Sequence, residues 1–239
     1  MAQRTILQIA QAVNAELGFP KPTTVVSSTD TNVIKLLALI TATCEDLMNE
    51  FDWQALQKRY TFNTQNGVEE YALPTDTERF ISSSFFDQNN RWPMQGPLNA
   101  TEWEALRVSG LNASPFQRYR VFGNMLHLFP TPGASPYTFV YEYVSNSFCT
   151  SSGGVAQTTV QQDSDIILLD SRCVIYGSKL KWLSSNNMDT TSALVDYMRA
   201  LDFAKSSDVP ARRLSLAGGS MGTPLLSTAN LPDTDFGGV

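Results

Sequence analysis

The imidazole of His127, the only histidine in the chain, is the side chain best suited to act as a general base near neutral pH. It lies in the stretch YRVFGNMLHLFPTPG, residues 119–133, where apolar and polar positions alternate around Gly123-Asn124. A two-residue turn there predicts a β-hairpin in which Arg120 faces His127. The arginine disfavours the protonated imidazole, and the hairpin holds no carboxylate that could orient it as a base. We therefore expect His127 to be a surface residue of a sheet rather than a catalytic group.

The register of this hairpin also divides its two faces. Pairing across the turn places Phe122 opposite Met125 and gathers four apolar side chains on one side. We expect that side to face a core, formed by Tyr119, Val121, Leu126 and Leu128.

Two further patterns could carry chemistry. The stretch AGGSMG, residues 217–222, has the glycine content of a phosphate-binding loop, but no predicted strand precedes it and no predicted helix follows it. Glu69 and Glu70 follow a turn at Gly67, a position typical of a solvated face. Catalytic carboxylate pairs come from distant positions, and the sequence does not single out a second member. We therefore expect no catalytic site and no cofactor.

The three cysteines, Cys44, Cys149 and Cys173, are far apart and form no CxxC pair. Cys44 and Cys173 fall in apolar helical stripes, where a thiol behaves as a small hydrophobic side chain. Together with one histidine, they lack the spacing of a metal site. The pattern fits synthesis and assembly in a reducing cytosol.

The charge balance argues against direct contact with nucleic acid. The chain has 17 Lys and Arg against 23 Asp and Glu, a formal net charge of −6, and its densest basic pieces are Lys58-Arg59 and Arg212-Arg213. A protein that grips phosphates needs a basic stripe. The start, MAQRTILQIA, lacks the apolar region of a signal peptide, and no apolar run approaches about 18 residues. We expect neither nucleic-acid binding nor a membrane span.

Helical spacing of apolar residues marks the N-terminal part of the chain. The first predicted helix follows Thr5, which can cap its start, and ends at Gly18. The second runs from about Asp30 to Phe51 and is apolar on more than one side. A helix of that kind packs against several neighbours.

Helical spacing returns near the other end of the chain. One helix is predicted from a cap near Asp163 or Ser164, with an apolar face that runs from Ile166 to Leu183. After a short loop, a second helix covers about 190–206 and forms a helical hairpin with the first. Its expected inward face consists of Leu194, Tyr197, Met198, Leu201 and Ala204.

Strand patterns fill the middle of the chain, apart from a short helix at about 99–109 capped by Asn99 and Glu102. Residues 59–74 predict a hairpin around Asn66-Gly67, and residues 79–96 predict a second hairpin whose edge suits Pro93. The polar segment 145–160 predicts a loop or a protruding hairpin.

An aromatic row alternates strictly along residues 135–145. Such a row suits a sandwich core or a subunit contact, and it could also stack sugars or bases. Because no basic residues lie between the rings, we favour the core or contact for Tyr137, Phe139, Tyr141 and Tyr143.

These elements predict an α+β fold. Residues 1–57 and 161–206 would form a helical bundle, with an antiparallel β domain, residues 58–160, inserted into it. Residues 207–239 show no periodic element, yet they are apolar and poorly charged for a disordered tail. We expect them to form an extended arm that becomes ordered on another protein.

The order of local motifs resembles a known family. Asp52-Trp53 ends a helix, a strand follows at Tyr60, and Pro74-x-Asp76-x-x-Arg79 comes after the turn. The hairpin around Gly123 then leads through Pro130-x-Pro132 to the aromatic row. Over residues 3–206 this succession resembles the head-to-tail adaptor proteins, also called connector or tail-tubular-A-like proteins, of short-tailed bacteriophages.

The resemblance implies a structural virion protein at the head–tail junction, assembled in the host cytoplasm. Such adaptors form a twelve-fold ring below the portal protein, extend the DNA channel and give the tail nozzle protein a docking surface. DNA would pass through the lumen without specific binding. In the family, C-terminal arms reach the portal, a role that here falls on 207–239 with the candidate anchors Leu214, Leu216, Met221, Leu225, Leu226 and Phe236.

Two alternatives from other functional classes stay open. Some adaptors of this type have been described as lytic, and a peptidoglycan hydrolase would require two carboxylates in a cleft. A carbohydrate-binding β module would use the aromatic row as a stacking platform.

Overall fold

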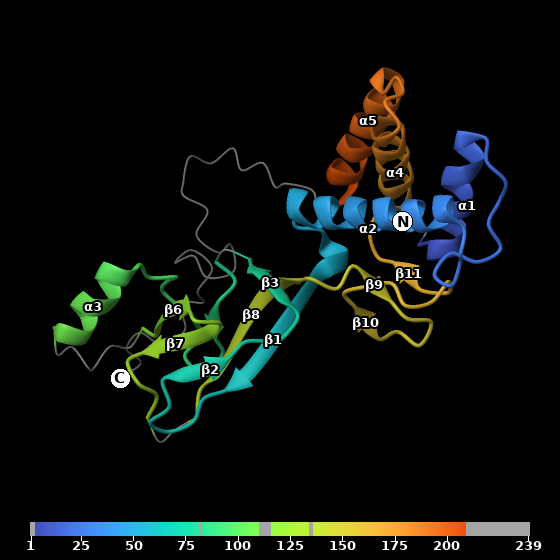
Figure 1. Cartoon of the computed structure of the whole chain (residues 1–239). Helices are drawn as coiled ribbons and strands as arrows, with labels where there is room; N and C mark the ends of the chain where they lie inside the picture. The colour runs from blue at the N-terminus through green and yellow to red at the C-terminus, as the bar shows by residue number, and fades with distance from the viewer. Residues whose placement is uncertain (1–2, 82, 110–115, 134–135, 209–239) are drawn as a thin grey trace, which may run out of the picture. The chain divides into compact units, whose positions relative to one another are not determined.

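The helices begin and end at the capping residues of the sequence. In the computed structural model, α1 (Ile6–Leu17) follows Thr5, whose hydroxyl accepts a hydrogen bond from the Gln8 amide while the Gln8 side chain accepts one from the Thr5 amide. The helix ends at Gly18, whose φ of 78° a residue with a Cβ rarely adopts. The structure describes residues 3–81, 83–109, 116–133 and 136–208, which belong to one compact unit (Figure 1).

Two more predicted helices are confirmed. Helix α2 (Thr31–Glu50) starts after Asp30, whose carboxylate accepts a hydrogen bond from the Asn32 amide. Helix α3 (Ala100–Val108) carries the predicted capping box between Asn99 and Glu102. A short 3₁₀ turn, η1 (Gln54–Leu56), joins α2 to the first strand.

The helical hairpin near the C-terminal side is confirmed as α4 (Ser171–Ser185) and α5 (Thr191–Asp208), but the predicted start of its first helix is wrong. Ile166–Ile167 forms a short strand, β11, that pairs with β9 (Cys149–Thr150). The cap of α4 is Asp170, whose carboxylate accepts hydrogen bonds from the amides of Arg172 and Cys173. Apolar spacing alone does not separate a short buried strand from the first turn of a helix.

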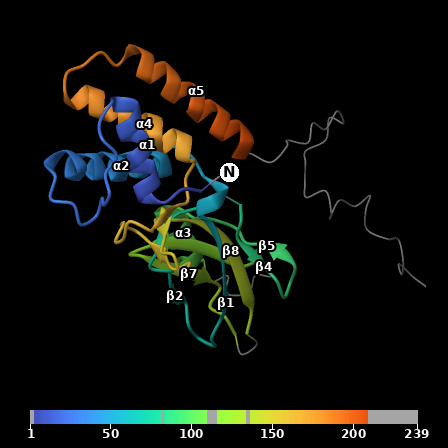
Figure 2. The ribbon, with the colours of Figure 1, turned by 90° about the vertical axis from the view of Figure 1, so that its right-hand side faces the viewer.

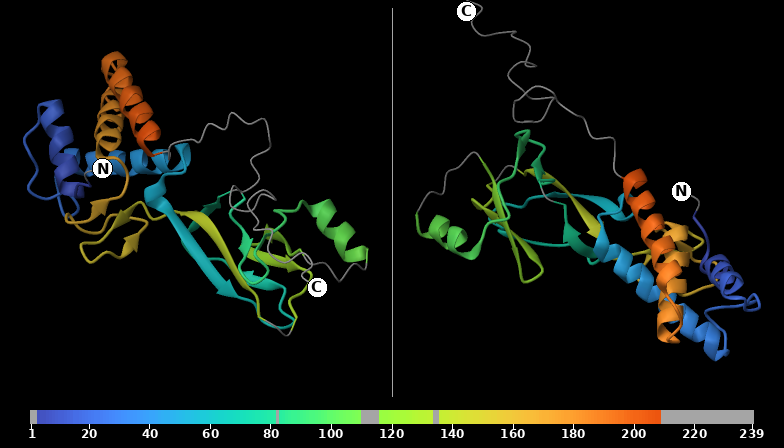
Figure 3. Two further views of the ribbon diagram at one scale, coloured as in Figure 1. Left: turned by 180° about the vertical axis from the view of Figure 1, so that it is seen from behind. Right: turned by 90° about the horizontal axis from the view of Figure 1, so that it is seen from above.

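The four long helices share one core. Helices α1 and α5 lie on opposite sides of α4, and α2 crosses beneath them (Figures 1 and 3). The small sheet formed by β10 (Ala156–Gln157), β9 and β11 supplies side chains to the same core. Since β9 pairs with β10, the polar segment 145–160 contains a hairpin, one of the two predicted possibilities. Fully buried members include Ile6, Ile9, Leu36, Ile40, Cys44, Leu47, Phe148, Ile167 and Cys173.

A five-stranded antiparallel sheet is built around β8 (Thr138–Ser145), which pairs with β1 (Gln57–Asn63), β3 (Thr77–Phe80) and β4 (Phe86–Asp87). The predicted hairpin edge at Pro93 is confirmed, because β5 (Trp92–Pro93) pairs only with β4 at the edge of this sheet.

The predicted hairpin around Asn66-Gly67 is wrong. The turn is present, but all seven residues of β1 pair with β8, and β2 (Glu70–Ala72) joins β7 (Met125–Phe129) in a separate sheet. Pairing with the long strand β8 gives β1 more hydrogen bonds than the short β2 could offer, and it brings Phe62 against Phe139.

The three-stranded sheet has the order β2–β7–β6, where β6 is Arg118–Phe122. The predicted β6–β7 register is confirmed, including Arg120 opposite His127. The two sheets share an aromatic core, in which Phe85 stacks on Tyr119 at 3.9 Å and on Tyr141 at 4.7 Å between ring centres. Helix α3 lies beside β6 and β7 (Figures 1 and 2).

The fold is therefore α+β, with helices at both ends of the chain and a β region between them. The domain limits 1–57, 58–160 and 161–206 stay a prediction. Most of the arm predicted at 207–239 lies outside the described residues, and α5 itself continues to Asp208.

Candidate functional site

The residues that carry the adaptor resemblance meet where α2 joins the β region. The guanidinium of Arg79 donates a hydrogen bond of 2.6 Å to Asp52 Oδ1 and two of 2.8 and 2.9 Å to the carbonyls of Met48 and Phe51. Arg79 therefore closes the C-terminal end of α2, where backbone carbonyls lack helical partners. Trp53 fixes the same end from the other side, because its indole Nε1 donates to the Leu47 carbonyl at 2.6 Å.

A second polar cluster lies next to this end of α2. The carboxylate of Asp76 accepts hydrogen bonds from Lys58 Nζ at 2.6 Å, Ser145 Oγ at 2.8 Å and Tyr143 OH at 3.0 Å. Burial alone would raise the pKa of Asp76, but these three hydrogen bonds outweigh it and lower the pKa below the usual 3.8. Burial and the Asp76 carboxylate raise the pKa of Tyr143 to about 12.

These two clusters position elements. They bind the end of α2 to β3 and the loop before β3 to β1 and β8. Ser145 does donate to the Asp76 carboxylate, but the lowered pKa of Asp76 makes it a weak base and Ser145 is buried. Asp52, Asp76 and Arg79 belong to the motifs that indicate the adaptor resemblance, and the sequence alone predicted no role for them. Their residue types and spacing could have indicated such a role, because an arginine on a strand close to the end of a helix can donate hydrogen bonds to the last carbonyls of that helix.

The prediction that His127 is a surface residue is wrong, although the β6–β7 hairpin itself holds no carboxylate, as expected. Because β2 pairs with β7, Glu70 lies opposite His127, with 3.6 Å between Glu70 Oε1 and His127 Nδ1. The imidazole stacks on Phe122 at 4.2 Å between ring centres and meets the edge of Trp103 from α3. His127 is only 7% exposed, so the ring is a packed part of the hairpin rather than an open base.

The cysteines are small hydrophobic side chains, as expected for Cys44 and Cys173, and all three are fully buried. Burial raises the pKa of Cys149 to about 11 and that of Cys173 to about 12, and it raises the pKa of Cys44 further. Thiols in this state are poor nucleophiles and poor metal ligands. Among the described residues no group of three or more His, Cys, Asp or Glu is placed to hold a metal ion.

The aromatic row is core. Phe139, Tyr141 and Tyr143 are at most 5% exposed and pack with side chains of the three-stranded sheet. This confirms the sandwich-core prediction and removes the stacking surface that a carbohydrate-binding module would need.

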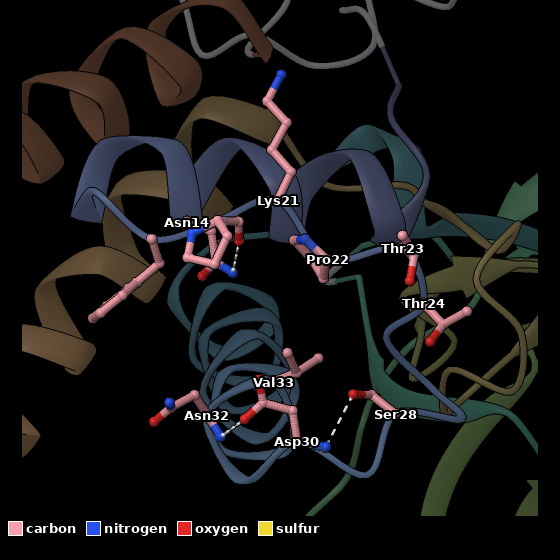
Figure 4. Close-up of a pocket in the computed structure, with 11 residues that line it drawn as sticks. Asn14, Lys21, Pro22, Thr23, Thr24, Ser28, Asp30, Asn32 and Val33 are labelled. Atoms are coloured by element: carbon pink, nitrogen blue, oxygen red, sulfur yellow. Dashed lines mark hydrogen bonds between the residues drawn. The ribbon is translucent and has the colours of Figure 1, made fainter.

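A hollow of about 310 Å³ opens between the end of α1, the loop 19–30 and the first turn of α2 (Figure 4). Two of its polar residues are committed to local structure, since Asn14 donates to the Pro20 carbonyl and Asp30 caps α2. Lys21 extends away from the hollow. The lining therefore suits an apolar or small polar side chain better than a reacting substrate.

The predicted inward face of α5 is partly wrong. Leu201 and Ala204 are buried, but Leu194 and Met198 are 42% and 51% exposed. Small residues make up much of the buried side instead, since Ala193 and Ala200 are also buried and Ala200 and Ala204 belong to the core shared with α4. Small side chains let α5 lie close to α4, and the larger side chains of Leu194 and Met198 then face solvent.

The six candidate anchors of the arm lie outside the described residues: Leu214, Leu216, Met221, Leu225, Leu226 and Phe236. Their assignment stays a prediction. No helix in the described ranges has the length and apolar character needed to cross a bilayer.

Comparison with known proteins assigns the family. A family model described as SU10 adaptor protein matches residues 4–217, which include all the helices and strands described above. No curated protein matches the chain. The family match confirms the resemblance to phage head-to-tail adaptors that the motif order indicated. The chain therefore belongs to the SU10 adaptor protein family and is a structural phage adaptor.

Proposed function

We propose that this adaptor forms a closed ring of twelve copies between the portal protein and the tail nozzle protein of a virion. The ring extends the DNA channel and offers tail components a docking surface. The observation that supports this proposal is the family match over residues 4–217. A closed ring of identical subunits needs two different faces on each copy, and the helical part has exposed apolar side chains on more than one face.

The acidic balance of the chain suits a channel through which DNA passes without specific binding. At a net charge of −6 per copy, twelve copies carry about −72, and DNA is also negative. A wall of like charge does not hold the DNA during ejection. This part of the proposal predicts that the assembled ring shows no measurable affinity for duplex DNA even at low salt, where basic contacts would bind most strongly.

Residues 207–239 are proposed as the arm that binds the portal after assembly in the host cytoplasm. The support is compositional, because this segment is apolar and poorly charged, and the six candidate anchors are among its apolar residues. A segment that orders on binding adds contact area without a larger folded core, and many arms binding together offset the ordering entropy.

We propose no catalytic role for the chain. His127 is enclosed by aromatic rings, and the raised pKa values of Cys149 and Cys173 keep both thiols protonated at neutral pH. Zymography on bacterial cell wall checks the hydrolase alternative, and a clearing zone at the purified chain would contradict the structural assignment.

Native mass measurement tests the ring and the arm together. The chain is measured alone and with its portal protein, with and without residues 209–239, because α5 extends to Asp208. We expect a complex with twelve adaptor copies per portal ring, lost on truncation while circular dichroism of the shortened chain is retained. Full docking of the truncated chain would overturn the arm assignment, and single copies bound to the portal would overturn the ring.

A further inference from the structure

Helix α4 is covered on two opposite sides, by α1 and by α5, and each covering element leaves apolar surface exposed (Figures 1 and 3). On one side, the exposed face of α5 is unlike that of an ordinary surface helix. On the other side, the loop after α1 carries an exposed phenylalanine next to a hollow.

The α5 face consists of residues that helical spacing brings together on the side away from α4. Leu194, Met198 and Asp202 follow one another at four-residue intervals, and Val195 lies beside them. Leu194, Val195 and Met198 are 42%, 52% and 51% exposed. Three large apolar side chains at this spacing form a ridge of the kind that packs into a groove.

The opposite side presents a complementary shape. The hollow of about 310 Å³ lies between α1 and the start of α2, and Phe19, Pro20, Pro22 and Val33 are among the residues that line it (Figure 4). Phe19 is 42% exposed, although its ring touches the edge of Trp182 on α4. The hollow is therefore a recess with a mixed lining, in which these four residues form an apolar patch beside polar side chains, and it is open to a side chain from outside.

The charges on the two surfaces are also complementary. Asp202 on the α5 face and Lys21 at the hollow are both exposed, and neither forms an ion pair or hydrogen bond within the ranges the structure describes. The other lysines of the helical part all have polar partners in this structure: Lys35 with Asn186, Lys179 with Glu16, Lys181 with Asp46 and Lys205 with Glu50. Among the described lysines of these helices and their loops, Lys21 is the one without a partner, so it is available to a group of another chain.

We propose that the α5 face of one copy packs into the hollow of a second copy, with Asp202 near Lys21. A contact between two identical patches would bury one of these surfaces and leave the other exposed. A head-to-tail contact buries both, and because the two surfaces lie on opposite sides of α4 it can continue from copy to copy. This inference rests on the proposed ring and names its subunit interface.

Disulfide trapping tests the contact on the adaptor assembled with its portal. The native thiols are fully buried, so an introduced surface cysteine reacts selectively. We use M198C on the α5 face and T23C, an exposed residue that lines the hollow. Each variant alone should stay monomeric on a non-reducing gel, a mixture of the two should give dimers, and the double variant should give a ladder of higher multimers.

The matched control is F203C. Phe203 is on the same helix and is 67% exposed, but it lies roughly 140° around the axis from Met198. A mixture of F203C and T23C should give no dimer. Dimers from M198C alone would show an isologous contact and overturn the head-to-tail arrangement.

Charge reversal gives a second measurement. D202K or K21E alone should raise the concentration needed for assembly about tenfold, and the double variant D202K/K21E should restore it. A complete ring that yields no M198C–T23C dimer would overturn this interface and leave the proposed function standing. Single copies on the portal, read by native mass, would overturn the proposed function and this interface together.

Discussion

Arg79 Nε lies 2.6 Å from Asp52 Oδ1, so a side chain of the β region closes the last turn of a helix in the bundle. The same guanidinium also binds the carbonyls of Met48 and Phe51. One planar group thus satisfies three acceptors at the end of α2. This residue is one link between the helical and β parts, beside the buried contacts of Leu56 and Val144 with the helical core.

We expect Arg79→Ala to lower the free energy of unfolding by about 1–2 kcal/mol, because the partly exposed ion pair adds little and the two carbonyl hydrogen bonds add most of the effect. Arg79→Lys should recover only a small part, since an ammonium lacks the planar fork. Urea denaturation measures the free energy of unfolding of both variants. Arg59→Ala is the control, because Arg59 is exposed and has no ion pair within the described residues. Equal losses at the two positions would contradict the role of Arg79.

The Asp76 cluster predicts a pH dependence. The pKa of Asp76 is lowered in the folded chain, so its contribution to stability is present above the unfolded value of 3.8 and is lost as pH falls through the lower, folded value. We expect Asp76→Asn to be less stable than the parent at pH 6 and to differ less from it at pH below 3.8. Chemical denaturation across this range gives the difference.

The control for this pH profile is Asp202→Asn. Asp202 is exposed and forms no hydrogen bond or ion pair with another described residue, so its variant should follow the parent curve at every pH. A constant difference between Asp76→Asn and the parent at all pH values would show that the loss comes from packing alone.

Local chemistry accounts for what was predictable from the sequence. The caps at Thr5 and Asn99 and the turn at Gly123-Asn124 involve residues close in sequence, and all three were predicted correctly. The partner of β1 was not predictable in this way. Asn66-Gly67 does form a turn, but β1 pairs with a strand that begins at Thr138, and the choice between partners depends on long-range burial.

The candidate site was less predictable for the same reason. The environment of His127 was misjudged because Glu70 and Trp103 reach it from other elements. The predicted inward face of α5 was partly wrong because the apolar residues of this helix lie on two neighbouring stripes, and spacing alone does not show which stripe is buried. Burial falls on the stripe of small residues, Ala193, Ala200 and Ala204, which allows α5 to approach α4 closely.

The native thiols should be inert in the folded chain. With a pKa of about 11, Cys149 is ionised to roughly 0.1% at pH 8, and burial hinders access further. We expect labelling by a thiol reagent to be slow in buffer and to reach three thiols per chain in denaturant. Absorbance of the released thiolate follows the reaction. Rapid labelling of one thiol in buffer would show that its surroundings open in solution.

Gly177 on α4 lies close to side chains of both α2 and α5. A Cβ at this position would lie 2.5 Å from Thr43 Cγ2 and 3.0 Å from Tyr197 Cε2. Alanine favours a helix over glycine by about 1 kcal/mol, yet overpacking costs about 1–3 kcal/mol, so Gly177→Ala should destabilise the chain overall. Thermal and urea unfolding measure the change.

A double variant separates this clash from other effects of the alanine. Thr43→Ser removes the Cγ2 methyl while keeping the hydroxyl that donates to the Leu39 carbonyl. Thr43→Ser should therefore be less harmful in the Gly177→Ala background than in the parent, a favourable coupling of the kind expected between contacting residues. Ser184→Ala, an exposed site in the same helix, should be neutral or slightly stabilising. If Gly177→Ala stabilised the chain as much as Ser184→Ala, the close packing at the crossing of these helices would not hold in solution.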